Sequence, residues 1–165
     1  MNKVALSAQE FPLPKWAGNL KKYTRNVLNV LGKDKWDISV LLCGDKTISS
    51  LNSSYRKKPG ATDILSFSLD EGEKFPCCGS GKHGEIIISL ESMRSNAKRY
   101  KISVDEELRR LLIHGILHLD GMDHSGSLEQ EDSIEPGKKP EPMLYLQEEV
   151  LAQLSNEHII GKDVL

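Results

Sequence analysis

Cysteine is scarce in this sequence, with three residues among 165, namely Cys43, Cys77 and Cys78. Cysteines so few and so placed exclude the disulfide framework that stabilises small secreted domains, and they fit a reducing cytosol. Cys77 and Cys78 with His83 make a poor second metal site, because cysteine ligands of zinc are usually separated by two to four residues. We therefore expect a cytoplasmic protein without structural disulfides.

Long apolar runs and an excess of positive charge are also missing. No stretch is apolar over a length that crosses a membrane, and residues 1–11 lack the pattern of a signal peptide. The 22 basic and 24 acidic residues give a net charge of -2, so any affinity for RNA must come from a local patch. Length and composition suit one globular domain over residues 1–165.

Histidine, by contrast, is concentrated, since three of the five histidines lie between residues 111 and 124. His114 and His118 are four residues apart, a spacing that places two side chains on one face of an α-helix. His124 cannot join them on a continuous helix, because ten residues of helix advance about 15 Å. Gly121 precedes it, and glycine accepts the left-handed conformation that ends helices. The pattern predicts a helix that stops after His118 and a chain that folds back.

These three histidines predict a metal centre with one open position. Buried together for structural reasons alone, each imidazole would need its own polar partner, at roughly 1–3 kcal/mol per unsatisfied group. A single ion satisfies all three, and three protein ligands with an open fourth position are typical of catalytic zinc. We assign His114, His118 and His124 as ligands of one Zn²⁺, while nickel, copper or iron would also suit imidazole. Because imidazole must be neutral to bind, affinity should fall below about pH 6.5.

Apolar periodicity predicts helices interleaved with strands along the chain. Residues 1–12 and 156–165 show neither period, and we expect them to be peripheral or flexible. The order of elements fits a single α+β or α/β domain, with the histidine helix at its centre because one side of it is rich in leucine. The expected helices cover about 14–31, 45–55, 93–100, 103–119 and 143–154, and the expected strands cover 36–42, 64–69 and 85–88.

Two blocks of the sequence resemble one protein family. Residues 114–124 read HGILHLDGMDH, while residues 51–56 and 62–67 read LNSSYR and TDILSF. Together they resemble the YbeY family of bacterial rRNA maturation factors, which are metal-dependent endoribonucleases. The likeness covers most of the chain, from about residue 37 to about residue 154, and the two blocks together are very specific.

The resemblance implies cleavage of single-stranded RNA in the maturation of small-subunit rRNA and in ribosome quality control. The partners would be an rRNA precursor and the small ribosomal subunit, with no part for DNA or a membrane, and the fold would be an α+β domain with a small mixed sheet covered by helices. Arg56 matches the arginine of the family, and because a guanidinium binds phosphate through two bonds, we expect it to grip the scissile phosphate. Asp63 is expected to orient neighbouring backbone. Ala61 replaces a usual proline and Glu85 a common aspartate.

Two other functions stay open at this point. The extended zinc-metalloprotease motif also places glycine and a third histidine after His-Glu-x-x-His, but Gly115 occupies the position of the glutamate that serves as general base. Glycine cannot relay a proton, which counts against a protease and leaves a nuclease without an obvious base. Asp120 and Asp123 are near in sequence and could orient a histidine. The second alternative is a non-catalytic ribosome-assembly factor with a structural metal.

Basic residues gather on the expected helix around residue 97 and on the first turns of the histidine helix. They are a candidate surface for an RNA backbone, although a solvated charged face explains them equally well. The acidic stretch 125–140 would repel RNA. The basic set comprises Arg94, Lys98, Arg99, Lys101, Arg109 and Arg110.

Overall fold

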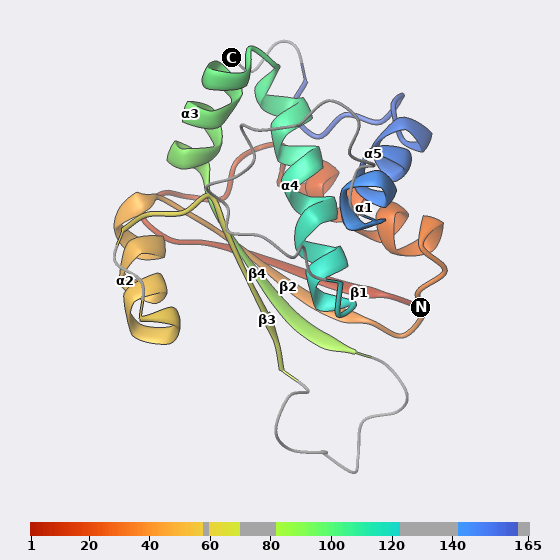
Figure 1. The fold of residues 1–165 in the computed structure, drawn as a ribbon, viewed down its shortest axis with the longest axis horizontal. Coiled ribbons are helices and arrows are strands. Elements are labelled where there is room, and N and C mark those ends of the chain that lie inside the picture. Colours follow the sequence, from red (N-terminus) through yellow and green to blue (C-terminus); the bar gives the residue numbers. More distant parts are fainter. Residues whose placement is uncertain (58–59, 70–81, 123–141, 162–165) are drawn as a thin grey trace.

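A four-stranded mixed sheet forms the centre of the protein (Figure 1). The structure is a computed structural model that describes residues 1–57, 60–69, 82–122 and 142–161. Strands β1, β2 and β4 are parallel, and β3 runs antiparallel to β4. The mixed sheet is therefore as expected, and the N-terminal segment supplies one of its edges. The strands are β1 (Lys3–Ala8), β2 (Asp37–Cys43), β3 (Ile64–Ser68) and β4 (His83–Ser89), in the order β1-β2-β4-β3.

Five helices within the described residues agree with the predicted segments to within a few residues. The first begins at Ala17 rather than Pro14, because the preceding residues form a turn in which the Ala17 N–H donates to the Pro14 carbonyl at 3.0 Å. None of these helices combines the length and the apolar character needed to cross a bilayer. The helices are α1 (Ala17–Val30), α2 (Asp45–Arg56), α3 (Leu90–Tyr100), α4 (Val104–Leu119) and α5 (Pro142–Gln153).

More helices pack against one face of the sheet than against the other. Successive side chains of a strand point to opposite faces, so in β2 Val40 packs into the larger core and Leu41 into the smaller one. The larger core contains apolar residues of α1, α4 and α5, whereas α2 is the helix whose apolar residues belong to the smaller core. In Figure 1, α2 lies apart from α4 and α5. The histidine helix α4 therefore belongs to the more deeply covered face.

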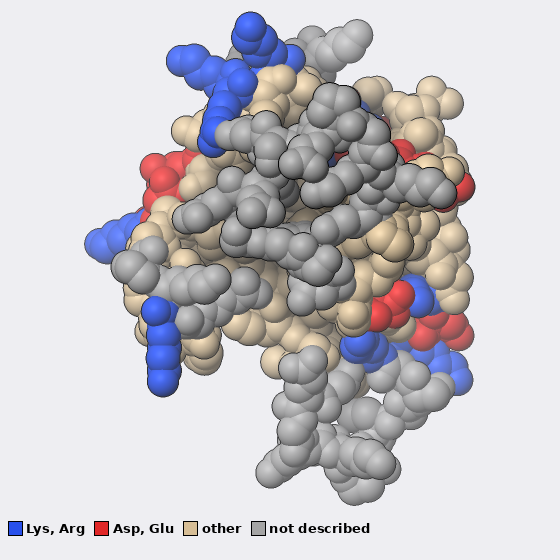
Figure 2. All heavy atoms as spheres, viewed as in Figure 1, with Lys and Arg blue, Asp and Glu red and all other residues tan. Residues whose placement is uncertain are grey.

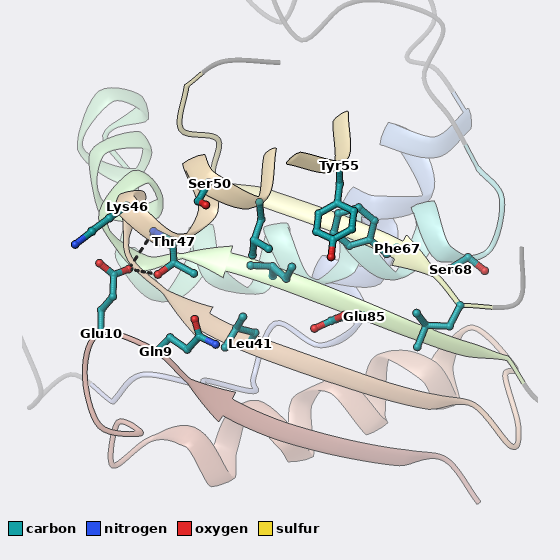
Figure 3. Close-up of a pocket in the computed structure, with 13 residues that line it drawn as sticks. Gln9, Glu10, Leu41, Lys46, Thr47, Ser50, Tyr55, Phe67, Ser68 and Glu85 are labelled. Carbon is teal, nitrogen blue, oxygen red and sulfur yellow. Dashed lines mark hydrogen bonds between the residues drawn. The ribbon is translucent and has the colours of Figure 1, made fainter. Parts of the chain in front are cut away.

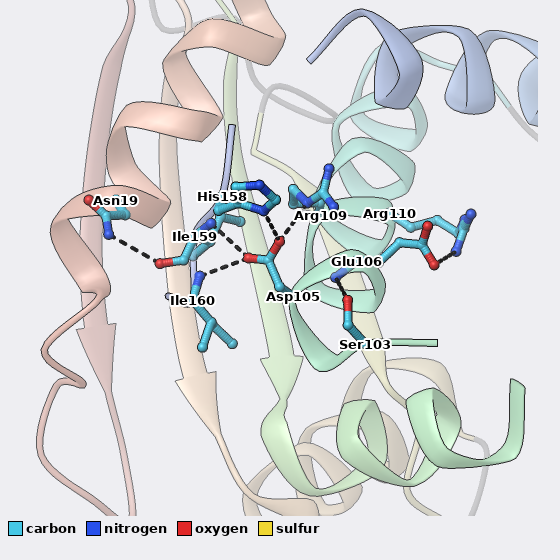
Figure 4. A network of polar contacts seen from close by, with 9 residues as sticks. All are labelled: Asn19, Ser103, Asp105, Glu106, Arg109, Arg110, His158, Ile159 and Ile160. Atoms are coloured by element: carbon cyan, nitrogen blue, oxygen red, sulfur yellow. Dashed lines mark hydrogen bonds and ion pairs between the residues drawn. The ribbon is translucent and has the colours of Figure 1, made fainter. Parts of the chain in front are cut away.

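The segment after α5 differs from the peripheral tail that we expected. Within the described part, Ile159 is fully buried and Ile160 is 8% exposed. Their backbone N–H groups donate to the Asp105 carboxylate at 2.7 and 2.8 Å, and the Asn19 amide donates to the Ile159 carbonyl at 3.2 Å (Figure 4). Residues 156–161 thus tie α1 to the start of α4. Two adjacent isoleucines show no helical period, which is why the sequence pattern missed this strap.

Candidate metal centre

Helix α4 holds the first two predicted ligands in a rigid frame. Its first turn is capped as expected, because the Ser103 hydroxyl accepts the Glu106 N–H at 3.1 Å. Burial continues on nearly every side of the helix, including Leu112, Ile113 and Leu117 at 0% exposure. A helix surrounded in this way cannot roll or slide, so the direction of its polar side chains is set by the core.

His114 and His118 point at one another, as the spacing predicts. Their Nε2 atoms lie 3.0 Å apart, and the ring centroids are 4.5 Å apart with the planes at 74°. Two nitrogens bound to one tetrahedral zinc at about 2.0–2.1 Å lie about 3.3–3.4 Å apart, a difference that a slight rotation of either ring removes. Both rings are partly buried. The pair therefore fits two positions of a single ion.

The helix ends where the glycine predicts. Gly121 has φ +85°, its N–H donates to the His118 carbonyl at 3.0 Å, and the Met122 N–H donates to the Leu117 carbonyl at 3.1 Å. This hydrogen-bond pattern reverses the chain at a helix end and favours glycine at the left-handed position. His124 and Asp123 lie outside the described residues, so a third ligand stays a prediction. Among the residues that the structure does describe, no group of three potential ligands is found.

The side chain of Gln147, which the sequence pattern did not single out, meets His114 from α5. Its Oε1 lies 2.8 Å from His114 Nδ1, and the residue is only 5% exposed. The sequence feature that could have identified Gln147 is its position one turn after Met143, which places a polar residue on the apolar face of an amphipathic helix. Buried polar side chains are informative because they need a partner.

Asp63 has a carboxylate with a hydrogen-bond partner on α3 and an electrostatic interaction with His114. Its backbone carbonyl accepts the Ser89 N–H at 2.9 Å, and the expected role of the residue in orienting neighbouring backbone stays a prediction. The carboxylate, however, accepts the Asn96 amide at 3.0 Å. Burial raises the pKa of this carboxyl, while the charge of His114 acts in the opposite direction. Asp63 is thus part of the electrostatic surroundings of His114.

Among the described residues, the partner of the Asp120 carboxylate is a lysine and not a histidine. The carboxylate pairs with Lys33 at 2.8 Å. The Lys82 ammonium donates to the Leu119 carbonyl at the end of α4, and both lysines lie over the Trp36 ring at 5.6 and 5.5 Å from its centroid. Cations at a helix C-terminus interact favourably with the helix dipole. Asp120 and the two lysines therefore stabilise the end of the histidine helix.

Gly115 faces the sheet, which explains why no base can stand there. A Cβ at this position would lie 2.9 Å from Ile64 Cδ1, 3.2 Å from Ser66 Oγ and 3.3 Å from Ile86 Cδ1. The position after the first histidine therefore points into the contact between α4 and the sheet, at Ile64, Ser66 and Ile86. A metalloprotease needs a glutamate at that position, so the geometry adds to the case against a protease.

Gly115→Glu should lower the free energy of unfolding by roughly 2–3 kcal/mol, because it overpacks the contact and buries a carboxylate. Gly18→Glu is the matched control, since Gly18 is exposed on the first turn of α1 and a Cβ added there would meet nothing within 4 Å. It should change stability by less than about 0.5 kcal/mol. Urea denaturation measures both, and equal stability of the two variants would contradict this packing.

Arg56 is the last residue of α2, and its side chain lies outside the described residues. Beside it, Lys57 takes the left-handed conformation with φ 55°, and the Asn52 amide of α2 donates to the Gly60 carbonyl at 3.1 Å. The role of Arg56 in gripping phosphate stays a prediction.

Two members of the predicted basic surface do not belong to it. Arg109 is 8% exposed, with its Nε donating to Asp105 at 2.9 Å. Arg110 forms a two-bond pair with Glu148, at 2.8 and 3.2 Å. The residues that remain exposed are those on and after α3, and Figure 2 shows basic side chains at the end of the molecule where Figure 1 places that helix. They are Arg94, Lys98, Arg99 and Lys101.

A groove of about 910 Å³ lies on the other face of the sheet, beside α2 (Figure 3). Leu41 and Ile87 form part of its floor, and Tyr55 and Phe67 line it with ring centroids 5.6 Å apart. No histidine is among its described lining residues. Cys43 is buried on the same face, where burial raises the pKa of its thiol to about 11, so at neutral pH it is an uncharged packing residue of the smaller core. The histidine pair therefore remains the candidate centre.

Comparison with known proteins identifies a family for this chain. The family model described as Endoribonuclease YbeY matches residues 4–155. A protein of Treponema pallidum named Endoribonuclease YbeY is 43% identical over 157 residues, covering 93% of this chain and 90% of its own. Its namesake in Aquifex aeolicus is 38% identical over 112 residues, covering 68% and 72%.

A solved structure shows the same fold. The solution structure of TM1509 from Thermotoga maritima superposes with a TM-score of 0.58 at 23% identity, covering 99% of this chain and 97% of the other. At this identity the likeness speaks for the fold alone. The family model and the Treponema pallidum relative go further, since the model matches residues 4–155 and the relative is 43% identical over 93% of the chain. This protein belongs to the endoribonuclease YbeY family.

Proposed function

We propose that this protein is a metal-dependent endoribonuclease that cuts single-stranded RNA in the cytoplasm. Its substrate would be an rRNA precursor of the small ribosomal subunit, and its task the maturation and quality control of that subunit. The observation that carries the proposal is the family match over residues 4–155 on a chain whose His114 and His118 converge to 3.0 Å. Relatives in several bacteria are named Endoribonuclease YbeY.

The proposed ligands are His114, His118 and His124, and the proposed ion is Zn²⁺. Buried α4 fixes the first two imidazoles, and the left-handed turn at Gly121 starts the return that His124 needs. Three imidazoles are neutral ligands and leave the full charge of the ion unbalanced by the protein. A divalent ion held in this way lowers the pKa of water and polarises a phosphoryl oxygen.

Arg56→Ala should lower the rate of RNA cleavage by roughly 10²–10³-fold while zinc content stays at one ion per chain. The reason is that a cation on the phosphate matters most as charge develops in the transition state, and the removal of one such donor costs about this much. Arg25→Ala, on an exposed position of α1, is the matched control and should cleave normally. Unchanged cleavage by Arg56→Ala would remove this residue from the mechanism.

A cleavage assay with purified protein tests the activity itself. Labelled single-stranded RNA should be cut internally, a duplex of the same sequence should be spared, and DNA of that sequence should remain intact. A chelator should abolish cleavage, and added Zn²⁺ should restore it. If zinc-loaded, folded protein cuts no RNA, the non-catalytic assembly factor becomes the better account; if cleavage survives the complete removal of metal, the metal mechanism is wrong.

A further inference from the structure

Gln147 is a buried amide on a helix otherwise packed by apolar residues. At 5% exposure its side chain has lost most of its water, and a buried amide left without a hydrogen-bond partner is destabilising. Met143 and Leu151, one turn to either side, are also buried and hold this face of α5 against the core. The side chain therefore has little freedom, and its contact with His114 Nδ1 at 2.8 Å is built into the packing of two helices.

The neighbouring residue strengthens this placement. Glu148 binds Arg110 through two bonds, at 2.8 and 3.2 Å, and Arg110 precedes His114 by one turn of α4. Two adjacent residues of α5 thus hold two residues one turn apart on α4. The pKa of Glu148 is held below its ordinary value first by Arg110 and also by the side-chain amide of Gln147. The atom of Gln147 that faces His114 Nδ1 is its carbonyl oxygen, Oε1, at 2.8 Å.

The chemistry of imidazole turns this contact into a choice of tautomer. A neutral histidine carries one N–H and one lone pair. A carbonyl oxygen can only accept, so His114 must donate from Nδ1 to Gln147 and must keep its lone pair on Nε2. That lone pair is the one that faces His118 Nε2 at 3.0 Å. A partner on the second ring nitrogen commonly fixes the orientation of a metal-binding histidine.

We propose that Gln147 is a positioning residue, which holds His114 in the Nδ1-protonated tautomer with Nε2 directed at the metal. The inference rests on the proposed function, because it concerns His114 as a ligand. An amide orients the ring without adding negative charge, whereas a carboxylate would also make the imidazole a stronger donor. Gln147→Glu should therefore keep or raise metal affinity, and Gln147→Met, of similar length but without an acceptor, should lower it.

Competition with a chromophoric chelator measures this effect without reference to activity. Gln147→Met should weaken Zn²⁺ binding about 10–100-fold, Gln147→Glu should bind at least as tightly as the original chain, and Gln153→Met should bind normally. Gln153 is the matched control, since it is an exposed glutamine on the same helix. Gln147→Met affinity within twofold of the original would overturn the inference. Failure of the unaltered chain to bind zinc would instead count against the proposed function.

Nitrogen NMR of the metal-free, unsubstituted protein gives a second test that needs no variant to fold. Above the titration range of histidine, the proton of His114 should sit on Nδ1, with Nε2 showing the chemical shift of an unprotonated ring nitrogen. An Nε2-protonated ring would refute the inference even if zinc binds. In Gln147→Met the same signals should report a mixture of tautomers, and in Gln153→Met they should be unchanged.

Discussion

His118→Ala is expected to abolish zinc binding and RNA cleavage together. The two Nε2 atoms of His114 and His118 converge to 3.0 Å, so removal of one ring leaves a single described imidazole at the centre. Loss of a residue that only hydrogen-bonds to a metal ligand already lowers metal affinity or activity about 10–100-fold. Loss of the ligand itself should lower them further. His114→Ala and His124→Ala should behave in the same way, as measured by zinc content after dialysis and by cleavage of single-stranded RNA.

His158→Ala is the matched control for this experiment. His158 lies on the C-terminal strap with its side chain 57% exposed and contacts Asp105, which places it at the opposite end of α4 from the predicted turn. The variant should keep one zinc per chain and near-normal cleavage. Normal zinc content in any one of the three ligand variants would refute the shared site.

Asp105→Ala is expected to lower the free energy of unfolding by about 3–5 kcal/mol, the usual cost of breaking a buried ion pair. Arg109, 8% exposed, would lose the carboxylate that its Nε contacts at 2.9 Å. The N–H groups of Ile159 and Ile160 would lose their acceptor as well (Figure 4). Glu106→Ala is the control, because its pair with Arg110 at 3.7 Å is partly exposed and worth less than about 1 kcal/mol.

The loss of stability caused by Asp105→Ala should depend on pH, because the Asp105 carboxylate titrates. Burial pushes the pKa of Asp105 upward, but the N–H groups of Ile160 and Ile159, with His158 and Arg109, outweigh it and hold the pKa below its ordinary value of 3.8. A lowered pKa means that the ionised group stabilises the folded state fully above the ordinary value, and that this contribution is lost as pH falls through the lowered one. The difference in free energy of unfolding between Asp105→Ala and the unaltered chain should therefore have its full size at pH 7 and become smaller below about pH 4. Urea denaturation measures this difference in unfolding free energy. A difference that stays constant from pH 7 to below about pH 4 would contradict the role given to the ionised Asp105 carboxylate.

The features that follow from local rules are the ones that the sequence predicts well. A spacing of four residues on a helix brings His114 and His118 together, and glycine takes the left-handed turn at Gly121, whatever the rest of the fold does. The strands β2 and β4 are similarly visible because alternation and continuous apolar runs report burial directly. Residues 114–121 therefore needed no tertiary information.

Contacts between distant segments were not predictable in this way. Gln147 reaches His114 across 33 positions of sequence, and the strap at Ile159 reaches Asp105 across 54. Neither contact leaves a periodic trace, because each depends on how two elements pack after they have formed. The basic surface was overestimated partly for the same reason, since Arg110 finds Glu148 on α5. The pair of Arg109 with Asp105 is instead an i,i+4 contact on α4, which the sequence spacing already allows.

X-ray absorption spectroscopy at the zinc edge of the zinc-loaded protein tests the three-histidine centre most directly. We predict three imidazole nitrogens and one further light atom at about 2.0–2.1 Å, with no sulfur, and one imidazole fewer in any His124→Ala protein that still retains zinc. A sulfur ligand near 2.3 Å, or a shell with fewer than three imidazoles in the unaltered chain, would contradict this centre.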